Sequence, residues 1–235
     1  MRKLVVVTGG SKGIGRAILV KFLSEGFDVV TCSRTEAHLD EFSSSIRRQF
    51  PEATVYTQVA DLSVAADVTK FCQFVSRLDR QIDVLVNNAG FFLPGKIVSE
   101  ADHTLPTMIN ANLYSAYNTT RGLMPCVRRG EGSYIFNMCS IASFMAYSNG
   151  GSYAISKFAL LGFSKCLREE LKEEGIRVSA VMPGATLTDS WAGTTIPDQR
   201  FVKPEDVADT VYAAYALSPR AVVEEIVIRP QLGDL

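Results

Sequence analysis

Short runs of apolar and mostly β-branched residues recur along the chain, and longer stretches in which apolar residues follow a helical period separate them. Runs with so few polar positions are typical of strands that are covered on both faces. The pattern predicts seven strands, at residues 3–7, 28–32, 54–59, 83–86, 133–138, 177–181 and 222–228.

The stretches between these runs are amphipathic and long enough to be helices. Helices that alternate with strands imply right-handed crossovers between parallel strands. We therefore predict a doubly wound α/β fold, a single domain over residues 1–235 whose seven-stranded parallel sheet carries helices on both faces. The expected helices lie at about residues 14–25, 36–49, 64–79, 105–128, 151–173 and 204–216.

The segment 186–203 is the exception to this alternation. Its sequence, TLTDSWAGTTIPDQRFVK, has no periodicity and is rich in Thr, Gly and Pro. It follows a predicted strand, and doubly wound folds bind their ligands at the carboxyl ends of strands. We expect a long loop that contributes to a substrate site.

The charges of the chain nearly cancel. It carries 24 basic and 25 acidic side chains, so it has no overall positive charge with which to bind nucleic acid or an anionic membrane. No apolar run approaches the length that crosses a bilayer, and the run at the N-terminus is too short for a secretory signal. We expect neither nucleic-acid nor membrane partners.

The cysteines are scattered and odd in number, and none belongs to a C-x-x-C pair. This pattern fits reduced thiols better than disulfides or a zinc site, and it favours the cytoplasm. We expect no metal site. The five cysteines are Cys32, Cys72, Cys126, Cys139 and Cys166.

A glycine-rich turn, TGGSKGIG at residues 8–15, directly follows the first predicted strand and opens the first predicted helix. Gly9, Gly13 and Gly15 let the backbone turn tightly and let a pyrophosphate approach the helix N-terminus, where free N–H groups favour an anion. Many strand-to-helix turns need glycine for geometry alone, but this position after the first strand is typical of dinucleotide-binding Rossmann folds.

The end of the second predicted strand indicates which dinucleotide is bound. Sites for NAD usually place an acid there, whereas this chain has Ser33 and Arg34 and no acid before Glu36. Lys12 adds a second cation beside the glycine turn, and the pair suits the charge of a 2′-phosphate. We predict NADP(H) as the cofactor, against the alternative that Lys12 and Arg34 are ordinary surface cations.

Tyr153 and Lys157 are four residues apart in GGSYAISKFALLGF, so they share one face of a predicted helix. One interpretation is a surface helix whose lysine extends to solvent. The other is a pair that transfers a proton.

At this point the chain resembles the short-chain dehydrogenase/reductases over essentially its whole length. The resemblance rests on motifs that occur in the order expected of that family. They are TGGSKGIG at 8–15, DLS at 61–63, NNAG at 87–90, Asn112 within NANLYSAYNTT, Ser140, YAISK at 153–157 and PGATLT at 183–188.

The resemblance implies a catalytic tetrad of Asn112, Ser140, Tyr153 and Lys157. Tyr153 would protonate the alkoxide that forms as a carbonyl is reduced. The positive charge of Lys157, helped by the oxidised nicotinamide, would lower the pKa of the phenol from about 10 towards about 7. Ser140 would bind the substrate oxygen, and Asn112 would hold a water of the proton relay.

The same resemblance, with the glycine turn and the two cations, gives the expected cofactor contacts. They are Gly9, Ser11, Lys12, Gly13, Ile14, Gly15, Ser33, Arg34, Asp61, Leu62, Asn88, Ala89, Gly90, Tyr153, Lys157, Pro183, Gly184, Thr186 and Thr188. His38 and His103 fall outside the motifs, and we expect them at the surface.

Aromatic and apolar residues near the motifs suggest the substrate. We expect a pocket for a flat or apolar carbonyl compound, with walls drawn from Phe91, Phe92, Phe144, Met145, Tyr147 and Trp191. The segment PGATLTDSWAG and the ending SPRAVVEEIVIRPQLGDL resemble bacterial sepiapterin reductases, which reduce a diketone side chain on a pterin. Asp189 and Asp234 are then candidate contacts for the pterin.

Two other functions stay open. A 3-oxoacyl-thioester reductase would need a basic patch for its acidic carrier protein, and Arg128 and Arg129 offer a small one. A non-catalytic NADP(H)-binding sensor would have no need of Tyr153 or Ser140. By resemblance, the helices at 105–128 and 151–173 would pair copies of the chain into a homodimer or homotetramer, and the apolar FALLGF suits such an interface.

Overall fold

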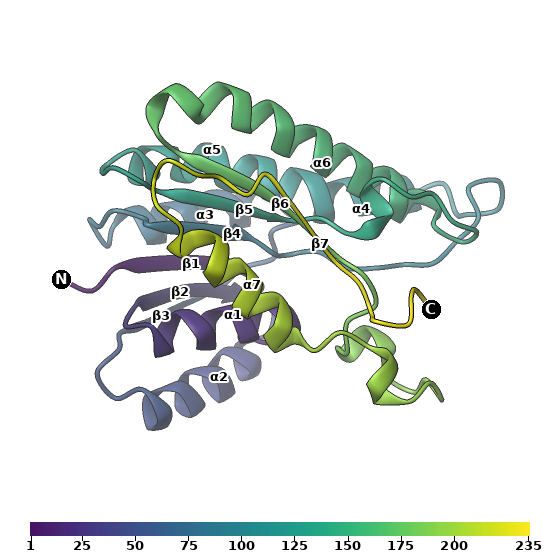
Figure 1. Cartoon of the computed structure of the whole chain (residues 1–235), viewed down its shortest axis with the longest axis horizontal. Coiled ribbons are helices and arrows are strands. Elements are labelled where there is room, and N and C mark those ends of the chain that lie inside the picture. The colour runs from purple at the N-terminus through teal and green to yellow at the C-terminus, as the bar shows by residue number, and fades with distance from the viewer.

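The predicted strands form one parallel sheet, in the order β3-β2-β1-β4-β5-β6-β7 (Figure 1). This computed structural model describes residues 1–235. The order reverses between β1 and β4, which makes the switch point where doubly wound folds bind ligands. The seven-stranded fold is confirmed. The strands are β1 (Leu4–Thr8), β2 (Asp28–Ser33), β3 (Val55–Val59), β4 (Val84–Asn87), β5 (Tyr134–Met138), β6 (Arg177–Pro183) and β7 (Glu225–Ile228).

Helices cover both faces of the sheet (Figure 1). Their bounds are α1 (Gly13–Ser24), α2 (Glu36–Gln49), α3 (Ala65–Ser76), α4 (Thr104–Ile109), α5 (Ser115–Val127), α6 (Gly151–Leu171) and α7 (Pro204–Ala216). None of them combines the length and the apolar character that crossing a membrane requires.

Alternate strand residues point into two separate cores, which explains why the strands read as unbroken apolar runs. Val5 and Val7 pack with residues of α1, α2 and α7 on one face. Leu4 and Val6 pack with residues of α3, α5 and α6 on the other. Burial on both faces leaves no room for the polar alternation of an exposed sheet.

The predicted helix 105–128 is interrupted. A π-helical turn, η1 (Asn110–Tyr114), separates α4 from α5. Such turns insert an extra residue into a helix and are frequent at functional sites. The apolar period of the sequence continues through the turn, so it gave no sign of the interruption.

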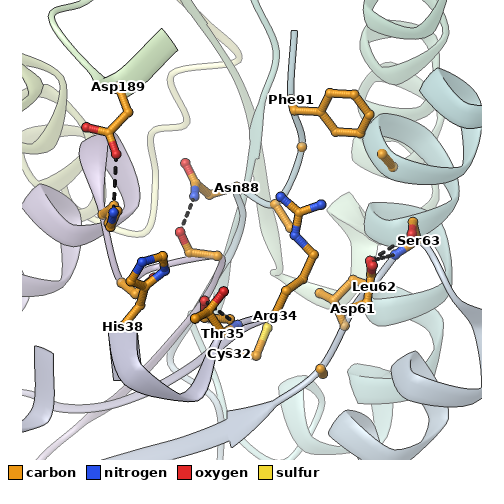
Figure 2. Close-up of a pocket in the computed structure, with 18 residues that line it drawn as sticks. Cys32, Arg34, Thr35, His38, Asp61, Leu62, Ser63, Asn88, Phe91 and Asp189 are labelled. Atoms are coloured by element: carbon orange, nitrogen blue, oxygen red, sulfur yellow. Dashed lines mark hydrogen bonds and ion pairs between the residues drawn. The ribbon is translucent and has the colours of Figure 1, made fainter. Parts of the chain in front are cut away.

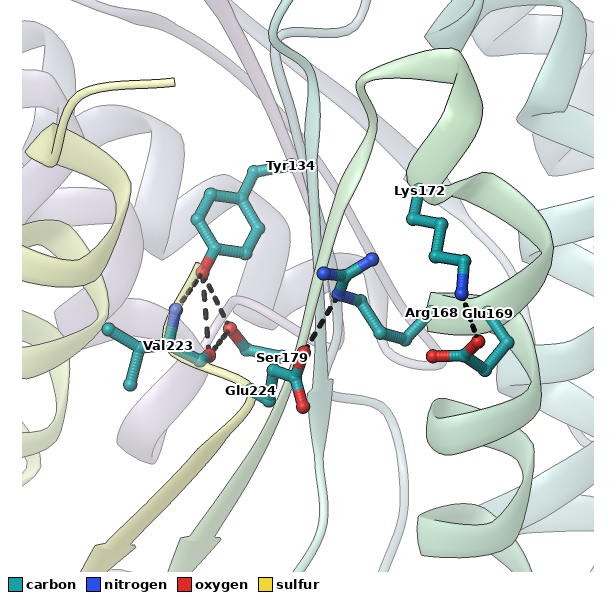
Figure 3. Close-up of polar contacts among 7 residues, drawn as sticks. All are labelled: Tyr134, Arg168, Glu169, Lys172, Ser179, Val223 and Glu224. Atoms are coloured by element: carbon teal, nitrogen blue, oxygen red, sulfur yellow. Dashed lines mark hydrogen bonds and ion pairs between the residues drawn. The ribbon is translucent and has the colours of Figure 1, made fainter. Parts of the chain in front are cut away.

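The last strand begins at Glu225 rather than at residue 222. Just before it, at Val223, the backbone bonds to side-chain hydroxyls instead of to the backbone of a neighbouring strand. The buried Tyr134 hydroxyl accepts from the Val223 N–H at 3.3 Å and pairs with Ser179 Oγ at 2.8 Å. Ser179 Oγ in turn donates to the Val223 carbonyl oxygen. Figure 3 shows this cluster, which joins β5 and β6 to the approach of β7.

The loop 186–203 is fixed at its base. Thr186 and Val202 form an isolated parallel bridge, in which Leu187 N donates to Val202 O at 2.9 Å. Between them lie two short 3-10 turns, η4 (Asp189–Trp191) and η5 (Asp198–Arg200). The edge-on contact of Trp191 with Phe201, at 5.0 Å between ring centroids, packs the loop on itself.

Candidate active site

Glycines shape the turn between β1 and α1. Gly9 and Gly13 have φ values of +65° and +54°, a left-handed conformation that residues with a Cβ rarely adopt. Gly15 permits a close approach, because a Cβ there would lie 2.5 Å from Asn88 Nδ2 and 2.8 Å from the Gly9 carbonyl oxygen. The turn therefore leads directly into the N-terminus of α1, where N–H groups favour an anion.

Thr8 and Asn88 tie this turn to the end of β4. Thr8 Oγ1 accepts from the backbone N–H groups of Asn88 and Ala89, both at 2.9 Å. Asn88 Nδ2 donates to the carbonyl oxygens of Thr8 and Gly9, both at 3.0 Å. The Asn88 amide thus holds the glycine turn in shape.

A cavity of about 350 Å³ lies beyond the carboxyl ends of β1, β2, β3 and β4. Figure 2 shows its lining. Many of the residues expected to bind a cofactor meet here, which brings together side chains from distant parts of the sequence. They are Gly9, Ser11, Lys12, Ser33, Arg34, Asp61, Leu62, Asn88, Ala89 and Gly90.

Other lining residues were not expected to bind a cofactor. His38 is the clearest case: it was expected at the surface, yet it lines the cavity from the first turn of α2. Arg34 precedes α2, so no helical spacing links the two residues, and the only signal in the sequence was the nearness of His38 to the end of β2. The remaining additions are Cys32, Thr35, Ala60, Ser63, Phe91, Ala111 and Asp189.

The charges around the cavity are mixed. Lys12 Nζ lies 3.5 Å from Asp189 Oδ2, so the loop after β6 brings an acid to the glycine turn. Asp61 Oδ1 accepts from the N–H and the hydroxyl of Ser63, at 3.0 and 2.7 Å, which leaves Oδ2 for a donor in the cavity. Arg34 is exposed in the link between β2 and α2.

The expected cofactor residues on α1 and after β6 lie outside this lining. Gly13 and Thr188 border a neighbouring cavity of about 550 Å³ between α1 and α7. Thr186 is buried, and its hydroxyl donates to the Gly184 carbonyl oxygen at 3.0 Å. The other residues outside the first cavity are Ile14, Gly15, Tyr153, Lys157 and Pro183.

Tyr153 and Lys157 lie on the first two turns of α6. Lys157 is only 7% exposed, and its ammonium donates to the Met138 carbonyl oxygen at 2.7 Å. It lies 5.8 Å from the centre of the Tyr153 ring. Burial lowers the pKa of Lys157 to about 8. The alternative of a surface helix whose lysine extends to solvent is therefore excluded, because Lys157 lies inside the protein.

The pKa of Tyr153 differs from the expectation. Burial raises the pKa of the phenol above its ordinary value, and a hydrogen bond with Ser140 opposes the rise. Lys157 alone does not produce the expected lowering, because the ammonium is directed to Met138 and desolvation of the phenolate dominates.

Ser140 and Asn112 are held by their neighbours. Ser140 lies two residues after the end of β5, and its Oγ accepts from the Ala142 N–H at 3.1 Å. Asn112 lies on the π turn and bonds to both backbone polar groups of Phe91. Its Oδ1 accepts from the Phe91 N–H at 2.9 Å, and its Nδ2 donates to the Phe91 carbonyl oxygen at 3.1 Å. It also donates to Ser156 Oγ on α6 at 3.0 Å.

A buried polar ladder supports this site. Asn87 Nδ2 donates to Asn137 Oδ1 and to Thr120 Oγ1, both at 2.8 Å, and Asn137 Nδ2 donates to Ser164 Oγ at 2.9 Å. The ladder joins β4 and β5 to α5 and α6, so it fixes the helix that carries Tyr153. Asn87 belongs to the NNAG motif, but Asn137 was not expected to be functional, since it lies within an otherwise apolar strand.

One exposed aromatic side chain packs against Tyr153. Phe92 packs edge-on against the Tyr153 ring at 4.9 Å between centroids. The expected pocket residues Phe91, Phe92, Phe144, Met145 and Tyr147 are all partly exposed. Of the two candidate pterin contacts, Asp234 is paired with Arg229 and Asp189 with Lys12.

Comparisons with known proteins agree with this geometry. The chain matches the short chain dehydrogenase family over residues 3–198. It is 32% identical over 243 residues to a sepiapterin reductase of Chlorobaculum tepidum, an alignment that covers 100% of this chain and 99% of that protein.

Solved structures of the family have the same fold. An L-sorbose reductase of Gluconobacter frateurii complexed with NADPH and L-sorbose superimposes with a TM-score of 0.88 at 28% identity, covering 97% of this chain and 95% of that one. A metagenomic short-chain oxidoreductase in complex with NADP gives a TM-score of 0.84 at 28% identity, covering 97% of both. These matches confirm the resemblance carried by the motifs, and the chain belongs to the short-chain dehydrogenase family of oxidoreductases.

Proposed function

We propose that residues 1–235 form one NADP(H)-binding domain that reduces the carbonyl of a ketone or diketone, with Tyr153 as the proton donor. The observation that carries this proposal is the placement of the buried Lys157 ammonium 5.8 Å from the Tyr153 ring, beside partly exposed aromatic residues. A surface role would not account for the burial of Lys157.

The cavity residues fit the proposed cofactor. The glycine turn forms a cradle that a Cβ on Gly15 would fill, and α1 begins directly behind it. Lys12 and Arg34 supply the cations for a 2′-phosphate, and the end of β2 carries no acid that would favour NAD. The NADPH and NADP bound to the sorbose reductase and the metagenomic oxidoreductase support this choice.

NADPH, when bound, supplies the hydride that the reaction requires. The protein supplies the proton and the electrostatic environment. Because burial raises the pKa of Tyr153, the phenol keeps its proton at neutral pH and has it available for an alkoxide. Ser140, whose side chain favours the ionised form of this phenol, would donate to the carbonyl oxygen of the substrate. Lys157 has two N–H groups left after its bond to Met138, and they are available to ribose hydroxyls.

The substrate we propose is a flat carbonyl compound such as a pterin with a diketone side chain. The sepiapterin reductase of Chlorobaculum tepidum supports it, as does the exposed Phe92 ring that packs on Tyr153. The basic patch that a carrier protein would need is already neutralised, because Arg128 pairs with Glu174 and Arg129 with Asp79, all at 2.6 Å. This pairing counts against the thioester alternative.

We also propose that the chain pairs with copies of itself and works in the cytoplasm. Partly exposed apolar residues on η1, α5 and α6, namely Tyr114, Tyr117, Ile155 and Phe158, support a homodimer or homotetramer. All five cysteines are free, which suits a reducing compartment.

Oxidation of NADPH tests the proposal. Purified protein is assayed with sepiapterin, small vicinal diketones, a 3-oxoacyl thioester and simple aldehydes, with NADH and Tyr153→Phe as controls. Turnover of sepiapterin or diketones with NADPH that is lost in Tyr153→Phe supports the proposal. Turnover of the thioester alone would favour the carrier-protein alternative, and NADPH binding without any turnover would favour a sensor.

A further inference from the structure

The helix that carries Tyr153 has no N-terminal cap of its own. α6 begins at Gly151, and Gly150 at its N-cap position offers no side chain to the first turn. The first N–H groups of a helix have no partner within the helix and need one from elsewhere. Tyr153 lies in this first turn, so its position depends on whatever satisfies those groups.

Glu100, from a segment far away in the sequence, supplies this cap. Its Oε1 accepts from the Ser152 backbone N–H at 3.0 Å, and its Oε2 accepts from the Ser152 hydroxyl. Ser152 is only 2% exposed, so the carboxylate bonds to a buried part of the helix. Gly151 makes room for it, because a Cβ at that residue would clash with Oε1.

The same segment contacts the neighbourhood of Tyr153 at other points. Asn112 is hydrogen-bonded to both backbone polar groups of Phe91, the first residue of this segment. Phe92 packs edge-on against the Tyr153 ring at 4.9 Å. Gly95 N donates to the Asn149 carbonyl oxygen at 3.0 Å, just before α6. Residues 91–100 thus form a strap that is fixed at Asn112 and at Ser152 and that supports the phenol between these two points.

We propose that Glu100 is a positioning residue that fixes Tyr153 for proton transfer, a role that rests on the proposed function of Tyr153. A carboxylate at a helix N-terminus is favoured by the helix dipole as well as by its hydrogen bonds. Without it, the first turn of α6 opens more often, and both Tyr153 and the strap that carries Phe92 lose their fixed place. Glu100 itself touches neither cofactor nor substrate in this scheme.

The test uses Glu100→Ala, Glu100→Gln and, as a matched control, Glu131→Ala, which changes an exposed glutamate in a turn away from the site. NADPH affinity is measured by fluorescence, and kcat by NADPH oxidation with the carbonyl compound that wild type turns over best. Hydrogen exchange of the amides 150–158 is measured on the protein without cofactor.

We expect Glu100→Ala to lower kcat by about 10- to 100-fold, because small displacements of a reacting group have effects of this size. NADPH affinity should stay within about twofold, since the cavity residues are untouched. Exchange at 150–158 should rise. Glu100→Gln, whose amide oxygen still accepts from the Ser152 N–H, should recover most of kcat and of the protection. Glu131→Ala should match wild type.

Unchanged kcat and unchanged exchange in Glu100→Ala would overturn the inference. A parallel fall of kcat and NADPH affinity in both Glu100 variants would also overturn it, because that result indicates general loosening. If wild type turns over no carbonyl compound, the proposed function fails, but faster exchange at 150–158 in Glu100→Ala alone would still show that Glu100 fixes the turn that holds Tyr153.

Discussion

Lys12 Nζ on the glycine turn lies 3.5 Å from Asp189 Oδ2 on the loop after β6. The two side chains are 50% and 82% exposed, so the pair contributes little to stability. Its effect is on the cavity, because the proposed partner of a cofactor phosphate is already partly neutralised by an acid. Under the proposed function, Asp189 therefore opposes the cofactor binding that Lys12 would favour.

We expect Asp189→Asn to tighten the binding of 2′,5′-ADP by up to about fivefold at low salt, since exposed pairs have energies of this order. Binding of 5′-AMP, which lacks the 2′-phosphate, should change less. Trp191, the only tryptophan of the chain, lies two residues away and reports the titration by its fluorescence. Asp198→Asn, in the same loop, is the control. Equal effects of the two variants would mean that Asp189 has no specific influence on Lys12.

Lys12→Met and Arg34→Met should each weaken NADPH binding by about tenfold or more, because each removes the charge-assisted contact that we propose for that residue. Binding of NADH should change little, since it lacks the 2′-phosphate. The dissociation constants follow from the fluorescence of the reduced nicotinamide. Arg47→Met, at the exposed end of α2, is the control for a general loss of positive charge. A fall for NADH as large as that for NADPH would place these cations elsewhere on the cofactor.

Lys157 makes stability depend on pH in an unusual direction. Its pKa falls from the ordinary 10.5 to about 8 on burial, so between these values the unfolded chain binds more protons than the folded one. The free energy of unfolding of wild type, measured in urea against Lys157→Met, should therefore rise by about 3 kcal/mol as the pH increases from 8 to 10.5. A difference between the two proteins that does not vary with pH would show that Lys157 titrates normally.

Tyr134→Phe should lower the free energy of unfolding by about 1 to 3 kcal/mol and leave NADPH binding intact. The substitution removes the buried acceptor of the Val223 N–H, and buried polar groups without a partner carry this cost. Tyr215→Phe is the matched control, because its hydroxyl accepts only from the exposed Lys3 ammonium. Urea denaturation compares the two. Equal losses would show that the cluster around Tyr134 does not hold β7.

The sheet and its helices could be predicted because apolar periodicity is a local signal. In β1 the apolar side chains alternate between the two faces of the sheet, as in Leu4, Val5, Val6 and Val7. An unbroken apolar run of this kind predicts a buried strand without any information about the other segments of the chain. The early start predicted for the last strand was wrong because the partners of Val223 are the hydroxyls of Tyr134 and Ser179. Nothing near residue 222 indicates them.

The candidate site also has one part that could be predicted from local sequence and another that could not. The glycine turn and the pair Tyr153 and Lys157 could be found because their residues are close in sequence. Glu100 and Ser152 are 52 residues apart, and Asp189 meets Lys12 only after the whole sheet has formed. The raised pKa of Tyr153 could not be predicted either, because it comes from the burial that surrounding segments provide.

The bonds from Thr8 and Asn88 to the glycine turn have a consequence for the thermodynamics of cofactor binding. They hold the turn in its left-handed shape, so its backbone loses little conformational entropy when a dinucleotide binds. The free energy of the phosphate contacts then contributes to affinity, because little of it is offset by the cost of ordering a loop. The Thr8 hydroxyl contributes indirectly, because it fixes the backbone of Asn88, whose amide holds the cradle.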